Sequence, residues 1–207
     1  MVIYLVRHAK DDESYRGGWS DLGLVEEGLN QAKLLGQYLH ENSQEFCISK
    51  LISSDLKRAI QTTREIEKAL QIEAQFSSEW RETNNGVLAG MLNSDALEVY
   101  PGLFFNALEM DEPYPEGESP REFYNRIKDT FNELCQSMLT QKENHNVMIV
   151  THSGVINIIY YLVKGLEWTN KSPNLSVANH TSIHKFDYKK QEWEIIESNN
   201  IAHLKEK

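Results

Sequence analysis

The chain alternates short, continuously apolar runs with longer segments whose apolar residues recur every three or four positions. The short runs predict β-strands, because strands covered on both faces carry apolar side chains throughout. The clearest are "VIYLV" near the start and "VMIV" before "THSG". The predicted strands span residues 2–6, 49–53, 74–77, 147–151, 182–188 and 192–197, and "DYKKQEWEII" joins the last two as a hairpin.

The longer periodic segments predict helices over residues 24–40, 54–70, 119–139 and 154–163. The third has a complete start signal: Ser119 as the N-cap, Pro120 at the first helical position and Glu122 reaching back to the cap. The fourth, "GVINIIYYLV", is nearly all apolar, which is typical of a buried helix.

Strands that alternate with helices predict an α/β fold. We expect one domain over residues 1–207, with three α/β/α layers and a mostly parallel central sheet of about six strands. Residues 83–118 differ, because they hold Pro101, Pro113 and Pro115 and show no long apolar period. We interpret this segment as an insertion that caps one end of the sheet.

The composition is that of a globular protein, with 40% apolar and 25% charged residues. The formal charge of −10 disfavours nucleic acid and anionic membrane surfaces as partners. No apolar run reaches the roughly 20 residues of a membrane span, and the start of the chain has no signal-peptide pattern. The isolated Cys47 and Cys135 are typical of a reducing compartment, so a cytoplasmic location is expected.

Charged and imidazole side chains follow four of the predicted strands. Because ligands bind beyond the carboxyl ends of strands in open α/β sheets, we expect these side chains to meet at one edge. Each alone is more often a structural or surface residue, and only their conjunction indicates a site. The candidates are Arg7 and His8 after the first strand, Arg58 after the second, Arg81 and Glu82 after the third, and His152 after the fourth.

This combination of side chains favours phosphoryl transfer. Guanidinium groups match phosphate oxygens, the helix that starts near Ser153 offers backbone N–H groups, and imidazole can be a covalent nucleophile. The chain has neither a Walker-type glycine-rich loop nor a clustered Asp/Glu set for magnesium. We therefore expect a reaction that uses no metal and no cofactor.

The motifs "LVRHA", "ISSDLKRAIQTT", "RETNNGVLAG" and "VTHSGV" resemble the histidine phosphatase superfamily, on its phosphoglycerate mutase-like branch. The resemblance covers nearly the whole chain, in the family's order. It implies that His8 is the nucleophile, that Arg7, Arg58 and His152 clamp the phosphate, and that Glu82 is the general acid and base.

The chain departs from the family pattern at two places. Ala9 stands where most members carry Gly, but its carbonyl can still accept from His8 Nδ1 and fix the tautomer. Ser14 stands where members often have an Asn that touches phosphate. We assign neither Ser14, Arg16 nor Ser20 to the site.

The sequence favours a phosphatase over a mutase. Mutases of the family need further cations for a second phosphate, whereas Thr83 follows Glu82 and no Lys or Arg occurs between Glu82 and Arg121. The expected substrate is a small-molecule phosphomonoester, because the smallest members that act on proteins lack a cap. Two alternatives stay open: a phosphoglycerate mutase, and a non-catalytic module that binds phosphate ligands. The substrate's identity and the oligomeric state also stay open.

Overall fold

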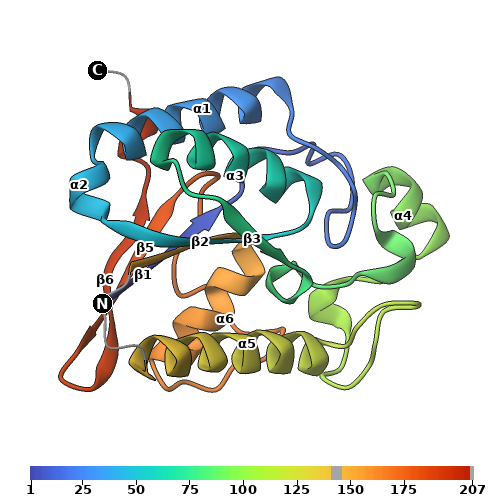
Figure 1. Cartoon of the computed structure of the whole chain (residues 1–207). Helices are drawn as coiled ribbons and strands as arrows, with labels where there is room; N and C mark the ends of the chain where they lie inside the picture. Colours follow the sequence, from blue (N-terminus) through green and yellow to red (C-terminus); the bar gives the residue numbers. More distant parts are fainter. Residues whose placement is uncertain (141–145, 206–207) are drawn as a thin grey trace.

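A six-stranded mixed sheet forms the centre of the fold (Figure 1). The computed structural model describes residues 1–140 and 146–205. The strands lie in the order β3-β2-β4-β1-β5-β6; β3, β2, β4 and β1 pair in parallel, and β5 and β6 add antiparallel pairs at the β1 edge. Their bounds are β1 Val2–Arg7, β2 Ile48–Ser54, β3 Ala74–Ser77, β4 Asn146–Thr151, β5 Ile183–Lys189 and β6 Glu192–Asn200. The predicted α/β class and mostly parallel sheet of about six strands are confirmed.

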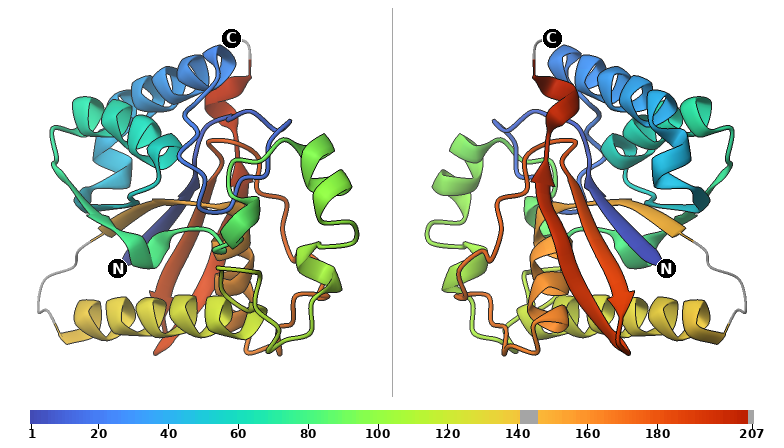
Figure 2. Two further views of the ribbon diagram at one scale, coloured as in Figure 1. Left: turned by 90° about the vertical axis from the view of Figure 1, so that its right-hand side faces the viewer. Right: turned by 90° about the vertical axis from the view of Figure 1, so that its left-hand side faces the viewer.

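Helices cover both faces of the sheet, which gives the three expected layers (Figures 1 and 2). The helices are α1 Glu26–Glu41, α2 Ser43–Phe46, α3 Lys57–Leu70, α4 Asn93–Val99, α5 Pro120–Thr140 and α6 Ser153–Val163. α1 and α3 lie on one face, and α5 and α6 lie on the other. Short 3-10 turns are η1 Ser78–Trp80, η2 Gly86–Leu88, η3 Phe105–Ala107 and η4 Ala202–Leu204.

The alternation of side chains along β1 divides the core in two. Ile3 and Leu5 belong to the cluster that includes Phe123 of α5. Tyr4 and Val6 belong to the cluster that includes Leu35 of α1. Each of these side chains is at least 97% buried, so β1 is covered on both faces as its continuous apolar run predicts.

Two local signals in the sequence form as expected. At the start of α5, Ser119 Oγ accepts from Glu122 N at 3.2 Å and Glu122 Oε2 accepts from Ser119 N at 2.8 Å, which completes the capping box. Between β5 and β6, Lys190 and Gln191 both adopt positive φ, 50° and 68°, as a two-residue hairpin turn requires.

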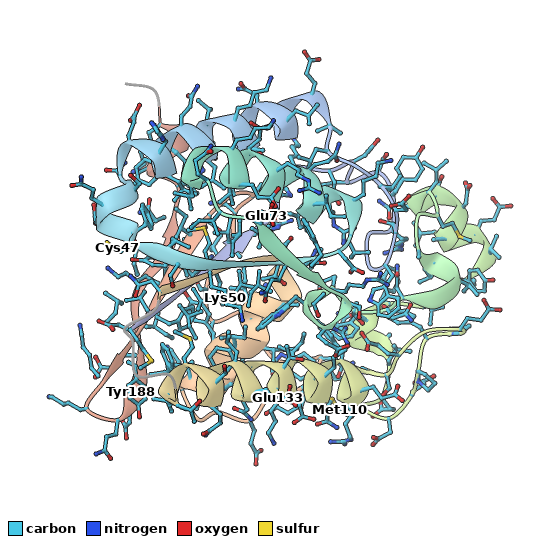
Figure 3. The ribbon with its side chains drawn as sticks, in the orientation of Figure 1. Cys47, Lys50, Glu73, Met110, Glu133 and Tyr188 are labelled. Atoms are coloured by element: carbon cyan, nitrogen blue, oxygen red, sulfur yellow. The ribbon has the colours of Figure 1, made fainter. Side chains whose placement is uncertain are left out.

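Residues 83–118 extend beyond the sheet and carry α4 (Figure 1). Met110, in this segment, lies beside the first turn of α5 (Figure 3), and its carbonyl accepts from Arg121 N at 2.9 Å. Part of the segment forms its own small core from Leu88, Ala96, Leu108 and Tyr114. That the segment caps a site stays a prediction.

None of the helices in the described ranges combines the length and hydropathy of a membrane span.

Gly28 lets α1 approach the loop that follows β1. It is buried in the first turn of α1, and a Cβ at this position would overlap the carbonyl oxygen of Lys10. The same loop carries Ala9 and Asp11, so the contact ties α1 to the segment that leaves β1.

We predict that Gly28→Ala destabilises the protein by about 1–3 kcal/mol, although alanine is the better helix former by about 1 kcal/mol. The control is Asn30→Ala, because Asn30 is exposed on the same helix and alanine has the higher helix propensity. Urea unfolding of both variants checks this. A Gly28→Ala variant as stable as the parent would mean that the helix and the loop are not in contact in solution.

Candidate active site

Strand pairing brings the two predicted histidines together. β1 and β4 are parallel neighbours with Arg7 opposite Thr151, so His8 and His152 leave the sheet side by side. His8 N donates to Thr151 O at 2.9 Å, and the centroids of the two imidazole rings are 5.0 Å apart. Both rings are buried, His8 at 4% exposed and His152 at 0%.

Arg58 lies between these histidines. β2 pairs with the other edge of β4, and α3, which follows β2, carries Arg58 in its first turn. Arg58 Nε donates to His8 Nε2 at 3.3 Å, and Arg58 Nη2 lies 3.3 Å from His152 Nδ1. The guanidinium is 2% exposed and therefore faces the site rather than solvent.

Arg7 adds a second guanidinium, held by the loop that precedes β5. Its Nη1 donates to Ala178 O at 2.8 Å, and its Nη2 lies 2.9 Å from His180 Nε2. Arg7 Nε is buried and has no hydrogen-bond partner among the described residues, so a donor remains for an anion. The structure thus brings Arg7, His8, Arg58 and His152 together, as the strand ends predicted.

The partners of Arg58 come mainly from the loop between β1 and α1. Arg58 Nη2 donates to Gly18 O at 2.7 Å, and Arg58 Nη1 donates to both Ser20 O and Ser20 Oγ at 3.3 Å. Arg58 Nε also lies 3.4 Å from Asp11 Oδ2. The sequence does not mark Asp11, Gly18 or Ser20 as partners of Arg58. Loop residues follow no periodic pattern, so the sequence does not indicate which of them turn toward Arg58.

The contacts of the other two unassigned loop residues are to residues other than the two histidines and Arg58. Ser14 is exposed, and its hydroxyl donates to Asp12 Oδ1 at 2.5 Å. The guanidinium of Arg16 lies 5.1 Å from the ring centroid of Phe104, in the 83–118 segment. Arg81, a candidate from the third strand end, instead pairs with Asp55, with its Nη2 2.7 Å from Asp55 Oδ2.

The contacts of His8 and His152 assign their tautomers. Arginine has only donors, so His8 Nε2 and His152 Nδ1 are the unprotonated nitrogens. The proton of His8 is then on Nδ1, which donates to Ala9 O at 2.7 Å. The proton of His152 is on Nε2, which donates to Ser54 Oγ at 2.8 Å. Ala9 is fully buried and supplies the carbonyl that the sequence analysis expected of it.

The electrostatics of the site keep the imidazoles neutral. Burial, and then the charges of Arg58 and Arg7, hold the pKa of His8 well below its usual value of 6.5. Burial and Arg58 lower the pKa of His152 in the same way. Burial and Arg7 lower the pKa of His180 to about 4. A neutral imidazole has a free lone pair, and two guanidinium groups beside it make the pocket cationic, so the arrangement is chemically suited to a nucleophile that attacks an anion.

The carboxylate of Glu82 lies against the first turn of α6. Its Oε2 accepts from Gly154 N at 3.0 Å and its Oε1 accepts from Thr83 N at 3.2 Å. Its backbone is held as well, because Glu82 O accepts from Trp19 Nε1 at 2.7 Å and from Arg126 Nη2 at 3.2 Å. Glu82 and Arg7 line the same cavity, so the predicted acid is near the predicted phosphate clamp.

Arg126 is a supporting residue that the sequence analysis missed. It also donates to the carbonyls of Glu79 and Arg81, at 2.9 and 3.1 Å, and pairs with Glu118 at 2.7 Å. One side chain of α5 therefore fixes the whole turn that carries Glu82. Nothing in the helical pattern of residues 119–139 separates this arginine from an exposed one.

Among the described residues, one group could supply three ligand atoms to a metal ion: His8, Asp11 and His180, whose ligand atoms lie within 4.8 Å of one another. The charges of Arg7 and Arg58 oppose a cation at this place, since both contact members of the group. The same charges favour an anion such as phosphate.

Comparison with known proteins decides the family. The model of the histidine phosphatase superfamily, branch 1, matches residues 3–201. The chain belongs to this superfamily. The resemblance drawn from its motifs is therefore confirmed.

Curated relatives of the chain include both phosphatases and mutases. The chain is 31% identical to phosphoserine phosphatase 1 of Hydrogenobacter thermophilus, with 100% of this chain and 95% of that protein covered. It is 28% identical to the probable phosphoglycerate mutase GpmB of Escherichia coli, with 99% and 95% covered.

Solved structures share the fold. The putative α-ribazole-5′-phosphate phosphatase of Escherichia coli aligns with a TM-score of 0.81 at 19% identity, over 97% of this chain and 96% of that one. A mycobacterial glucosyl-3-phosphoglycerate phosphatase aligns with a TM-score of 0.74 at 22% identity, over 96% and 98%.

The lowered pKa values give a direct test by NMR of histidine-labelled protein. Because a lowered pKa favours the neutral ring, His8 and His152 are expected to stay neutral as the pH falls from 7.5 through 6.5. We also expect an Nδ1-protonated pattern for His8 and an Nε2-protonated pattern for His152. His8→Ala and His152→Ala assign the resonances. A titration midpoint at or above 6.5 for His8 would contradict the electrostatic argument.

Proposed function

We propose that this histidine phosphatase hydrolyses small-molecule phosphomonoesters by transferring the phosphoryl group to His8 and then to water. The observation that carries the proposal is the unprotonated Nε2 of His8, 3.3 Å from a buried arginine, with a second histidine beside it and the charge of a second arginine acting on it. An imidazole lone pair in a pocket for anions is the arrangement that a phosphoryl acceptor requires. The phosphatase relative supports hydrolysis as the outcome.

In the first half of the reaction, the phosphate oxygens bind to Arg7 and Arg58, and Arg58 Nε turns from His8 Nε2 to a phosphate oxygen, which frees the imidazole lone pair. His152 joins them once the phosphate dianion favours a proton on its Nδ1, since its other nitrogen already donates to Ser54. His8 Nε2 attacks phosphorus, and the bond from phosphorus to the ester oxygen breaks in line with it. Glu82, as the carboxylic acid, gives its proton to the leaving oxygen, so that the free alcohol departs. Ala9 O accepts from His8 Nδ1 throughout and keeps the phosphorylated ring oriented.

In the second half, water takes the place of the alcohol. Glu82, now a carboxylate, accepts a proton from the water as its oxygen attacks phosphorus. The bond between phosphorus and His8 Nε2 breaks, inorganic phosphate leaves, and both residues return to their starting protonation states. The two guanidinium groups stabilise the charge on the phosphoryl oxygens in both steps. No metal takes part.

The mutase remains the second candidate, favoured by the mutase-named relative. A mutase would return the phosphoryl group to another oxygen of the substrate, and would retain a doubly phosphorylated intermediate. The absence of Lys and Arg between Glu82 and Arg121 argues against such retention. Release of inorganic phosphate, measured against isomerisation of 3-phosphoglycerate, separates the two.

The proposed reaction predicts covalent phosphate on His8. Mixing the enzyme with 4-nitrophenyl phosphate and EDTA should release a burst of nitrophenol equal to the enzyme, with phosphate attached at His8. His8→Ala should abolish the burst, and Glu82→Gln should slow turnover by roughly 10²–10⁴-fold with alkyl esters. Binding of phosphate with neither burst nor turnover would instead favour the non-catalytic module.

A further prediction of the proposed reaction concerns Gly154, which contacts the Glu82 carboxylate. A Cβ at this position would overlap the Glu82 carboxylate, the mobile end of a side chain, so Gly154→Ala should displace Glu82 with little effect on stability. The expected loss in kcat/KM is about 10- to 100-fold for an alkyl phosphate. It should be much smaller for 4-nitrophenyl phosphate, whose leaving group needs no proton. Equal losses with both esters would contradict the proposed role of Glu82.

A further inference from the structure

A cavity of about 640 Å³ opens beside the phosphate-binding groups. Arg7, Glu82 and Gly154 line one part of it, and the remaining lining comes from residues 83–123, from α6 and from the loop that follows α6. Its volume is in the range of sites for small molecules. The alcohol part of an ester whose phosphate is held by Arg7 would therefore occupy this cavity.

The lining has almost no charge. Arg7 and Glu82 are the charged residues among the described side chains that line the cavity, and the reaction already uses both. The nearby Lys171 does not line it, and its Nζ lies 3.0 Å from Glu109 Oε1 on the surface. A leaving group with a carboxylate would lose hydration here without gaining a cationic partner.

The polar groups of the lining are hydroxyls and amides, which bind hydroxyl groups as donors and acceptors. Thr83 Oγ1 is buried and has no hydrogen-bond partner within the described residues. Asn157 Oδ1 accepts from Leu175 N at 3.0 Å, which fixes the orientation of its amide. An unpartnered buried hydroxyl next to the general acid indicates a polar group of the ligand at this place.

Aromatic rings form another part of the lining: Phe105, Phe123 and Trp168. Trp168 stacks on Tyr124 with the ring centroids 5.5 Å apart and the planes at 7°, and its centroid lies 6.2 Å from that of Phe105. Asn170 ties this loop to the 83–118 segment, because its Nδ2 donates to Phe105 O at 2.6 Å. The aromatic surface is therefore rigid, and suits the apolar face of a ring.

We infer that the alcohol released from the substrate is an uncharged, hydroxylated ring, as in a sugar or a nucleoside, and not an amino acid or a glycerate. The inference rests on the proposed phosphatase activity and names the class of ester that the site accepts. Three features of the cavity favour such a ring: a lining with almost no charge, the unpartnered hydroxyl of Thr83, and the aromatic surface around Trp168.

The test compares kcat/KM for phosphate release from glucose 6-phosphate, adenosine 5′-monophosphate, O-phosphoserine and 3-phosphoglycerate. At least one of the two ring esters should exceed both charged esters by tenfold or more, and the difference between the two ring esters tells a sugar site from a nucleoside site. Equal values, or a preference for either charged ester, overturn the inference. Acetyl phosphate serves as the reference substrate. If neither acetyl phosphate nor any of the four esters releases phosphate, the proposed function itself fails.

Two variants complete the test. Thr83→Val removes the unpartnered hydroxyl at nearly constant volume, so the fold should persist. It should lower kcat/KM for the preferred ring ester about tenfold more than for acetyl phosphate, the loss of roughly one buried hydrogen bond. Lys171→Ala is the control and should change neither value. An equal effect of Thr83→Val on both substrates, or a specific loss in Lys171→Ala, contradicts the inference.

Discussion

The buried guanidinium of Arg58 is the group on which the site depends. It contacts His8 and His152 at the same time, and its donors fix which nitrogen of each ring is unprotonated. A charge with 2% exposure is costly unless it is paired and hydrogen-bonded. Asp11 and the oxygens of Gly18 and Ser20 supply these partners. The loop after β1 is therefore part of the charge balance of the site.

The sheet supplies the second constraint. β4 lies between β2 and β1 in the sheet. The segments that follow these three strands are far apart in the sequence, but they leave the sheet at the same edge and bring His8, Arg58 and His152 together. Glu82 reaches the same region by a separate route, through η1 and the hydrogen bonds of Arg126. Arg126 thus holds the Glu82 backbone from α5, whereas Gly154, two residues after His152, holds the Glu82 carboxylate. A change on α5 can move Glu82 while the histidines stay in place.

Much of this arrangement was readable from the sequence, because apolar runs mark strands and parallel strands end at one edge. The positions of Arg7, His8, Arg58 and His152 follow from that rule alone. Ser20, Asp11, His180 and Arg126 do not, since loops and exposed helix faces carry no period that shows which side chain turns inward. Arg81 is the opposite case: it follows a strand, as the rule requires, but its guanidinium pairs with Asp55 instead of joining the site.

The position of β4 also bears on how the chain assembles. β1 and β2 do not pair with each other, and both pair with β4, which begins at residue 146. A nascent chain that has not yet reached β4 can form α1 and α3, but it lacks the strand that joins β1 to β2. Closing such a long loop is entropically costly and slows folding. The two histidines therefore meet only after most of the polypeptide has left the ribosome.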